Sequence, residues 1–138
     1  MRLVSACLLG VKCAWNGESK ENKEILNLLG AGEVLIPVCP EQLGGLQTPR
    51  VPSERKGNIV INREGKDMTS YFIRGAQETL RICNLYGVSE VILKEKSPSC
   101  GVNRTYDGTF SDTLVEGKGV TTELLESNGI KVISSEEI

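Results

Sequence analysis

The sequence has no histidine, and this absence excludes several kinds of catalytic site. A Ser-His-Asp triad, a Cys-His protease pair and an HExxH zinc site all need an imidazole. Metal sites with histidine ligands are excluded for the same reason. Any acid–base chemistry must therefore come from carboxylates, thiols, hydroxyls or lysine.

Aromatic residues and positive charge are also scarce. The chain has one Trp, three Tyr and two Phe, which are too few and too scattered to form a platform for stacking bases. Its 16 basic and 18 acidic residues give a formal net charge of -2, so the basic footprint that tracks a phosphate backbone is missing. A large nucleic acid is therefore not the expected partner, and a small-molecule site is favoured.

No apolar run approaches the roughly 18 residues that span a bilayer, so no membrane contact is expected. The 138 residues suit one domain, and a single domain over residues 1–138 is predicted. Five cysteines are an odd number in a chain long enough to bury its own core. This count argues against a secreted disulfide framework and predicts a cytoplasmic, reduced protein. Nothing in the sequence specifies an oligomeric state.

Short apolar runs alternate with helical patterns along the chain. The runs predict buried strands at residues 2–6, 34–38, 91–93 and 131–133. Helices are predicted from Ser19 to Gly30, from Asp67 or Thr69 to Gly87, and from Thr121 to Gly129. Residues 59–61 and 63–67 predict a small hairpin, and residues 39–58 and 96–119 predict long loops.

Strands that are apolar on both faces are typical of parallel sheets covered by helices. The predicted fold class is therefore α/β. It is a single three-layer α/β/α domain, with a mostly parallel sheet of about four strands and a small hairpin insertion.

Three cysteines follow three of the predicted strands. Cys7 and Cys39 come directly after the first two, and Cys100 lies in the loop after the third. Because the carboxyl ends of parallel strands share one edge of the sheet, these thiols can meet there without a CxxC pair. Soft sulfur donors without histidine suit iron–sulfur or zinc chemistry. A site with three protein ligands keeps one position open for substrate or water.

The other two cysteines differ in what their positions predict. Cys83 falls on the apolar stripe of the longest predicted helix, where free cysteine behaves as a small core hydrophobe. Cys13 lies in a turn after Cys7, and three roles stay open for it. It can be a fourth ligand, a redox partner of Cys7 or a loop residue without a function.

Polar residues close to these cysteines are candidates for chemistry. Glu41 stands two residues after Cys39, where a carboxylate can act as a general acid or base, and a solvated loop charge is the alternative. Ser97 and Ser99 flank a proline shortly before Cys100. Their hydroxyls can position a water or bind a substrate carbonyl, or they can simply hydrogen-bond the turn.

Four sequence blocks carry a resemblance to a known family. They are Ser5-Ala6-Cys7-Leu8-Leu9-Gly10, Val38-Cys39-Pro40-Glu41 with Gly44-Gly45-Leu46 and Pro49-Arg50, Leu93-Lys94-Glu95 with Ser97-Pro98-Ser99-Cys100-Gly101, and Tyr106-Asp107-Gly108-Thr109-Phe110. In this order they resemble the 2-thiouracil desulfidases over nearly the whole chain.

The resemblance implies a [4Fe-4S] cluster held by Cys7, Cys39 and Cys100, with one iron lacking a protein ligand. It also implies an enzyme that removes sulfur from thiolated uracil, as free base or nucleoside, by a non-redox hydrolysis that releases hydrosulfide. By similarity, Glu41 acts in proton transfer or water activation and Ser97 binds or activates the ring. The implied partner is a small thiolated pyrimidine, whose soft C=S bond a soft metal centre polarises.

One loop departs from the family pattern. Where members commonly show Arg-Tyr-Asp-Gly, this chain has Ala14-Trp15-Asn16-Gly17. The missing Arg and the change of Asp to Asn alter what this loop contacts, so the departure bears on substrate choice more than on cluster binding. Trp15, whose indole can stack on a ring, and Asn16 are candidate substrate contacts together with Ser99.

Two other functions are compatible with the same cysteines. A binding or storage module would hold zinc or a sulfur species on its thiolates without turnover. A thiol redox sensor would use Cys7 and Cys13, form a reversible disulfide and be indifferent to Cys39→Ser. Metal analysis separates these functions, because a cubane cluster brings about four iron and four sulfide per chain.

Overall fold

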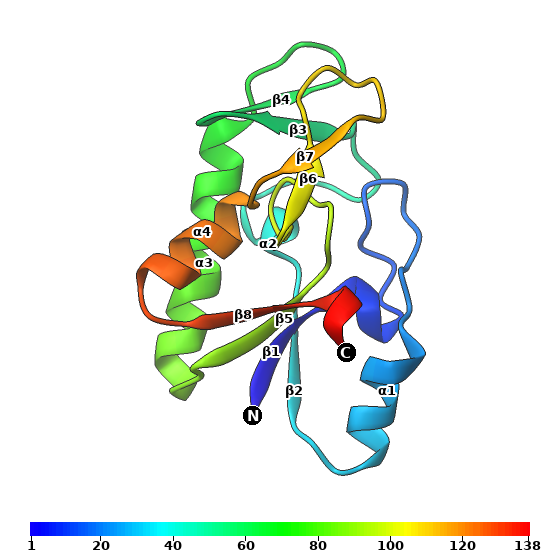
Figure 1. Ribbon diagram of the computed structural model, residues 1–138, viewed down its shortest axis with the longest axis vertical. Coiled ribbons are helices and arrows are strands. Elements are labelled where there is room, and N and C mark those ends of the chain that lie inside the picture. Colours follow the sequence, from blue (N-terminus) through cyan, green and yellow to red (C-terminus); the bar gives the residue numbers. More distant parts are fainter.

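A four-stranded parallel sheet lies at the centre of the protein (Figure 1). It is seen in a computed structural model that covers residues 1–138. The strands are β1 (Arg2–Ser5), β2 (Leu35–Val38), β5 (Glu90–Leu93) and β8 (Lys131–Ser134), in the order β2-β1-β5-β8. All three pairings are parallel, and Leu3 lies opposite both Ile36 and Val91. The α/β class and the sheet of about four parallel strands are therefore confirmed.

Helices cover both faces of this sheet (Figure 1). The helices α3 (Thr69–Tyr86) and α4 (Val120–Ser127) lie on one face, and α1 (Lys23–Gly30) lies on the other. Helix α3 ends where its pattern predicts, before Gly87, which has a left-handed φ of 65°. No helix combines the length and the apolar character that crossing a bilayer requires.

Successive strand residues point into the two layers in turn. Leu3 belongs to a core cluster with Cys83 of α3 and Leu125 of α4. The next residue, Val4, belongs to a second cluster with Ile25 of α1. All five of these side chains are fully buried, so the strands are apolar on both faces because both faces are covered. This arrangement confirms the three-layer prediction and the core position of Cys83.

Helix α1 begins and ends differently from its prediction. Asn22, not Ser19, caps it, because the Asn22 side chain accepts a hydrogen bond from the Ile25 N–H at 3.2 Å. Gly30 stays helical, and the left-handed turn falls two residues later at Gly32, which has a φ of 92°. Both errors arise because the sequence offers more than one polar cap and more than one glycine.

Two antiparallel hairpins extend beyond the sheet (top of Figure 1). They are formed by β3 (Ser53–Lys56) with β4 (Ile59–Asn62) and by β6 (Arg104–Tyr106) with β7 (Leu114–Glu116). The predicted pairing of residues 59–61 with 63–67 was wrong, since only one isolated bridge joins Ile61 to Asp67. Strand β3 was missed because its sequence, Ser-Glu-Arg-Lys, lacks apolar alternation. The strands β3, β6 and β7 lie in the stretches 39–58 and 96–119 that are predicted as loops, whereas β4 covers the predicted strand at 59–61.

Candidate active site

A cavity of about 310 Å³ opens at the carboxyl edge of the sheet. The chain passes from β2, on one side of β1, to β5 on the other side, so the strand order reverses beside β1. Parallel α/β sheets bind ligands at such a reversal. Four of the five cysteines line this cavity: Cys7, Cys13, Cys39 and Cys100.

Each strand-end cysteine is placed by the first residues after its strand. Cys7 lies in a short 3-10 helix, η1 (Ala6–Leu9), that follows β1 directly. Cys39 is the residue between β2 and the short helix α2 (Pro40–Leu43). Cys100 lies in the loop after β5 and is 5 % exposed. The structure thus brings these three thiols to one cavity from three separate strands.

Cys13 is the fourth thiol of the cavity and is 2 % exposed. Its thiol is within hydrogen-bonding reach of the Cys39 and Cys7 thiols. The Cys39 Sγ also lies 3.8 Å from the Cys13 carbonyl oxygen. The three roles that the sequence leaves open for Cys13 stay predictions, and its place beside Cys7 and Cys39 is compatible with a role as fourth ligand or as redox partner.

The pKa values of Cys13, Cys39 and Cys100 are raised. The hydrogen bond with Cys39 lowers the pKa of Cys13, but contact with Cys7 and burial outweigh it and raise that pKa to about 11. The hydrogen bond with Cys13 and burial raise the pKa of Cys39, and burial raises the pKa of Cys100 to about 12. Metal binding releases protons from thiols, so a cationic metal group would supply the charge that favours the thiolates here.

The spacing of the thiols bears on what they can hold. No three His, Cys, Asp or Glu side chains come close enough together to hold a single metal ion. A zinc ion needs its thiolates at about 2.3 Å from one point. An iron–sulfur cluster fills the space between its ligands and takes thiolates at separate corners. The cavity thiols, with no histidine beside them, are a soft donor set that fits an iron–sulfur cluster.

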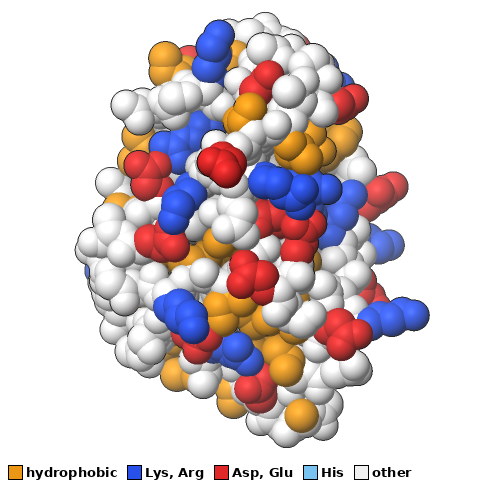
Figure 2. Space-filling view, in the orientation of Figure 1, with side chains coloured by type: hydrophobic (Ala, Val, Ile, Leu, Met, Phe, Trp, Pro, Cys, Tyr) orange, Lys and Arg blue, Asp and Glu red, His pale blue; other side chains and the backbone are white.

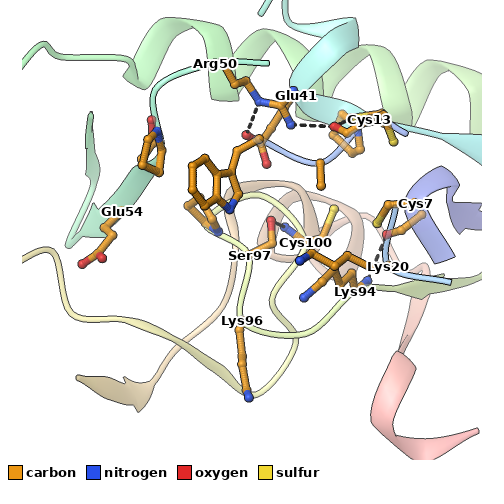
Figure 3. Close-up of a pocket in the computed structure, with 18 of the residues that line it drawn as sticks. Cys7, Cys13, Lys20, Glu41, Arg50, Glu54, Lys94, Lys96, Ser97 and Cys100 are labelled. Atoms are coloured by element: carbon orange, nitrogen blue, oxygen red, sulfur yellow. Dashed lines mark hydrogen bonds and ion pairs between the residues drawn. The ribbon is translucent and has the colours of Figure 1, made fainter. Parts of the chain in front are cut away.

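Glu41 lies in the first turn of α2 and is held by Arg50 (Figure 3). The Arg50 Nε donates to Glu41 Oε1 at 3.0 Å, and its Nη2 donates to the Cys13 carbonyl oxygen at 2.9 Å. The two charged side chains are 8 % and 16 % exposed, so this ion pair is largely shielded from water. Arg50 therefore fixes the carboxylate relative to the thiol loop and leaves Oε2 free.

Ser97 lines the cavity next to Cys100, at the start of a tight turn. Its Oγ accepts hydrogen bonds from the backbone N–H groups of Ser99 at 3.1 Å and Cys100 at 3.0 Å. Because the oxygen already accepts two hydrogen bonds, the hydroxyl proton is the part that remains available to a ligand.

The three expected substrate contacts have different positions. Trp15 lines the cavity and is 45 % exposed. Asn16 does not line it, because its side chain bonds the Glu18 backbone N–H and carboxylate in a local turn. Ser99 does not line it either, because its hydroxyl is 1 % exposed and bonded to the Thr121 hydroxyl at 2.8 Å. In this structure Asn16 and Ser99 support loops.

Several lining residues were not predicted from the sequence. Lys20, Lys94 and Lys96 line the cavity together with Arg50, and no motif marks them as a group (Figure 3). Ser5, at the end of β1, hydrogen-bonds the Cys100 thiol. Three of these lining residues lie inside the sequence blocks that resemble the family: Ser5, Arg50 and Lys94. Their place in these blocks was the only feature of the sequence that could have marked them as site residues. Acidic and basic side chains are interspersed on the face shown in Figure 2.

Comparisons with known proteins agree with this site. The chain matches the family described as 2-thiouracil desulfurase over residues 3–137. It is 39% identical to an uncharacterized Bacillus subtilis protein, YbbK, over 148 aligned positions that cover 100% of this chain and 97% of the relative. It is also similar to the solved structure of a [4Fe-4S]-dependent thiouracil desulfidase, TudS. That likeness has a TM-score of 0.94 and 43% identity over 99% of this chain and 91% of the other. The predicted resemblance is confirmed, and this chain belongs to the 2-thiouracil desulfurase family.

Proposed function

We propose that residues 1–138 form one desulfidase domain that removes sulfur from thiolated uracil, as free base or nucleoside, and releases hydrosulfide. The family match and the likeness to TudS support desulfidase function on thiouracil. The observation that carries the proposal for this chain is that three strand-end thiols and Glu41 line one cavity. Free cysteines at this site also favour a reduced, cytoplasmic setting.

The proposed ligands of a [4Fe-4S] cluster are Cys7, Cys39 and Cys100. Three protein ligands leave one iron open to the substrate, in agreement with the need for a reactive position. Cys13 would border the cluster without holding it. When bound, the cluster would supply a soft Lewis acid that polarises the C=S bond of the substrate.

The protein's own residues would handle water and protons. Arg50 orients Glu41 through Oε1, so the free Oε2 is the atom that takes a proton from the attacking water. Ser97 would donate a hydrogen bond from its hydroxyl to a ring oxygen or nitrogen, and Trp15 would pack against the ring. In net terms one water is consumed, C=O replaces C=S, and the sulfur leaves as hydrosulfide, HS⁻. The second proton of the water passes through Glu41 to the solvent. No electron enters or leaves.

Anaerobic purification followed by iron and acid-labile sulfide analysis tests the ligand set. About four of each per chain are expected. Cys7→Ser, Cys39→Ser and Cys100→Ser should each lose most of the iron and the release of hydrosulfide from thiouracil. Cys83→Ala, in the core, is the matched control and should keep both. Wild-type iron and activity in any of the three ligand variants would contradict the assignment.

The contact of Cys13 with two other thiols favours a second candidate, a thiol redox sensor. Such a sensor would form a reversible disulfide on treatment with peroxide, and it would hold no iron after anaerobic purification. Thiol titration before and after peroxide, with Cys13→Ser as the comparison, distinguishes it from the desulfidase.

A further inference from the structure

Glu95 is a buried acidic residue to which the proposed chemistry gives no role. It is the second residue of the loop that carries Ser97 and Cys100, and it is 2 % exposed. None of the protein's ion pairs includes it. A carboxylate buried without a cation must be compensated by hydrogen bonds.

Those hydrogen bonds come mainly from the backbone of its own loop. The donors to Oε1 are the backbone N–H groups of Val102 at 2.7 Å, Asn103 at 2.9 Å, Arg104 at 3.0 Å and Lys96 at 3.4 Å. Oε2 accepts from the Ser134 hydroxyl of β8 at 2.6 Å and from the Asn103 side chain at 3.3 Å. Backbone groups of the loop therefore converge on one carboxylate. The hydrogen bond from Ser134 of β8 connects this carboxylate, and with it the loop, to the sheet.

The anchored residues lie on both sides of Ser97 and Cys100. Lys96 precedes them and has a φ of 70°, a left-handed backbone that a lysine adopts only when its surroundings hold it there. The segment between the anchors is tightly packed at Gly101, because a Cβ on this residue would lie 2.8 Å from the Ser97 and Arg104 carbonyl oxygens. Moving either anchor must therefore move the reactive side chains.

We propose that Glu95 is a positioning residue whose carboxylate shapes residues 96–104 and thereby holds Cys100 Sγ and Ser97 Oγ at the cavity. This inference rests on the proposed ligand role of Cys100. Glu95 touches neither the cavity nor a reacting atom, so it acts through the loop alone.

The test compares Glu95→Gln and Glu95→Ala with Asn62→Ala. Asn62 is a matched control, since it is also a buried side chain that accepts two backbone N–H bonds, but in the turn after β4 and not in the loop that carries Cys100. The readout is the rate at which iodoacetamide alkylates Cys100 in the full, metal-free chain, measured by peptide mass spectrometry. Cys83, buried in the core, is the internal reference.

Glutamine keeps the shape of the side chain but not its charge, so the hydrogen bonds to the loop weaken. Cys100 should be alkylated about tenfold faster in Glu95→Gln. This rate change corresponds to a decrease of about 1.4 kcal/mol in the free energy of opening the loop that covers Cys100. Glu95→Ala should show a larger effect, and Glu95→Gln decides the matter if the alanine variant does not fold. Cys83 reacts only on global unfolding, so its rate should stay well below the Cys100 rate in every variant, and Asn62→Ala should leave the Cys100 rate unchanged.

Two results would overturn the proposal. An unchanged Cys100 rate in Glu95→Gln would show that the carboxylate does not hold the loop, and equal rates at Cys100 and Cys83 would show that Cys100 reacts only through global unfolding. Iron analysis of Cys100→Ser separates this proposal from the ligand assignment. If that variant keeps its iron, the assignment fails, while a selective rise in Cys100 reactivity still supports the positioning role.

Discussion

Glu95 should make the stability of the protein fall in acid by an amount that the structure sets. Burial raises the pKa of Glu95, but hydrogen bonds from the Ser134 hydroxyl and from three backbone N–H groups outweigh burial. They lower this pKa from 4.5 to about 2. A depression of this size corresponds to about 3 kcal/mol of unfolding free energy at neutral pH.

The direction follows from which state binds the proton more tightly. The unfolded chain takes up a proton on Glu95 at a higher pH than the folded chain does. The stabilisation is therefore complete well above pH 4.5 and is lost as the pH falls toward 2. About 2 kcal/mol of it should disappear between pH 5 and pH 3.

Urea unfolding of the metal-free chain and of Glu95→Gln, at several pH values from 7 to 3, measures this loss. Other carboxylates titrate in both proteins, so the difference between the two unfolding free energies isolates Glu95. That difference should shrink by about 2 kcal/mol on going from pH 5 to pH 3. A difference that does not change with pH would refute the reasoning, because it would mean that the folded protein does not favour the ionised carboxylate.

Five further substitutions have expected outcomes. Arg50→Met should cost about 3 kcal/mol of unfolding free energy because it leaves a shielded carboxylate without its partner. Arg2→Met, in a more exposed ion pair, should cost less than about 1 kcal/mol in the same urea experiment. Gly75→Ala should lower stability by about 3 kcal/mol, since its Cβ would lie 1.9 Å from a carbonyl oxygen of α2, and Gly30→Ala, with open space around it, should cause no loss. Cys83→Ala should cost about 1 kcal/mol with unchanged iron content, and a drop in iron would contradict its core role.

The fold was largely predictable where one physical pattern dominates a segment. The apolar strand runs and the long stripe of α3 have no competing interpretation, because only burial on both faces or on one helical face accounts for them. The hairpin at β3 was not predictable, since Ser53–Lys56 is polar and its pairing with Ile59–Asn62 depends on the connecting turn. Cap positions at α1 were ambiguous for a similar reason, because several residues can make the same local bond.

Part of the candidate site was likewise predictable from the sequence, and part was not. Thiols after parallel strands can be placed at one edge from sequence order alone, which is why Cys7, Cys39 and Cys100 were grouped. The same argument says nothing about which way a loop side chain turns. Asn16 and Ser99 stand beside cavity residues in sequence, yet a local hydrogen bond to Glu18 holds the Asn16 side chain and a long-range one to Thr121 holds the Ser99 hydroxyl away from the cavity.

By itself the sequence determined the α/β class, the family and the set of thiols available for a cluster, because these depend on residue types and on their order along the chain. Only the tertiary structure decided that Arg50 holds Glu41, that Cys13 joins the other thiols and that one buried carboxylate ties down the Cys100 loop. These contacts join residues whose relation no local pattern encodes, since their distance and orientation are set by how the loops pack once the sheet has formed.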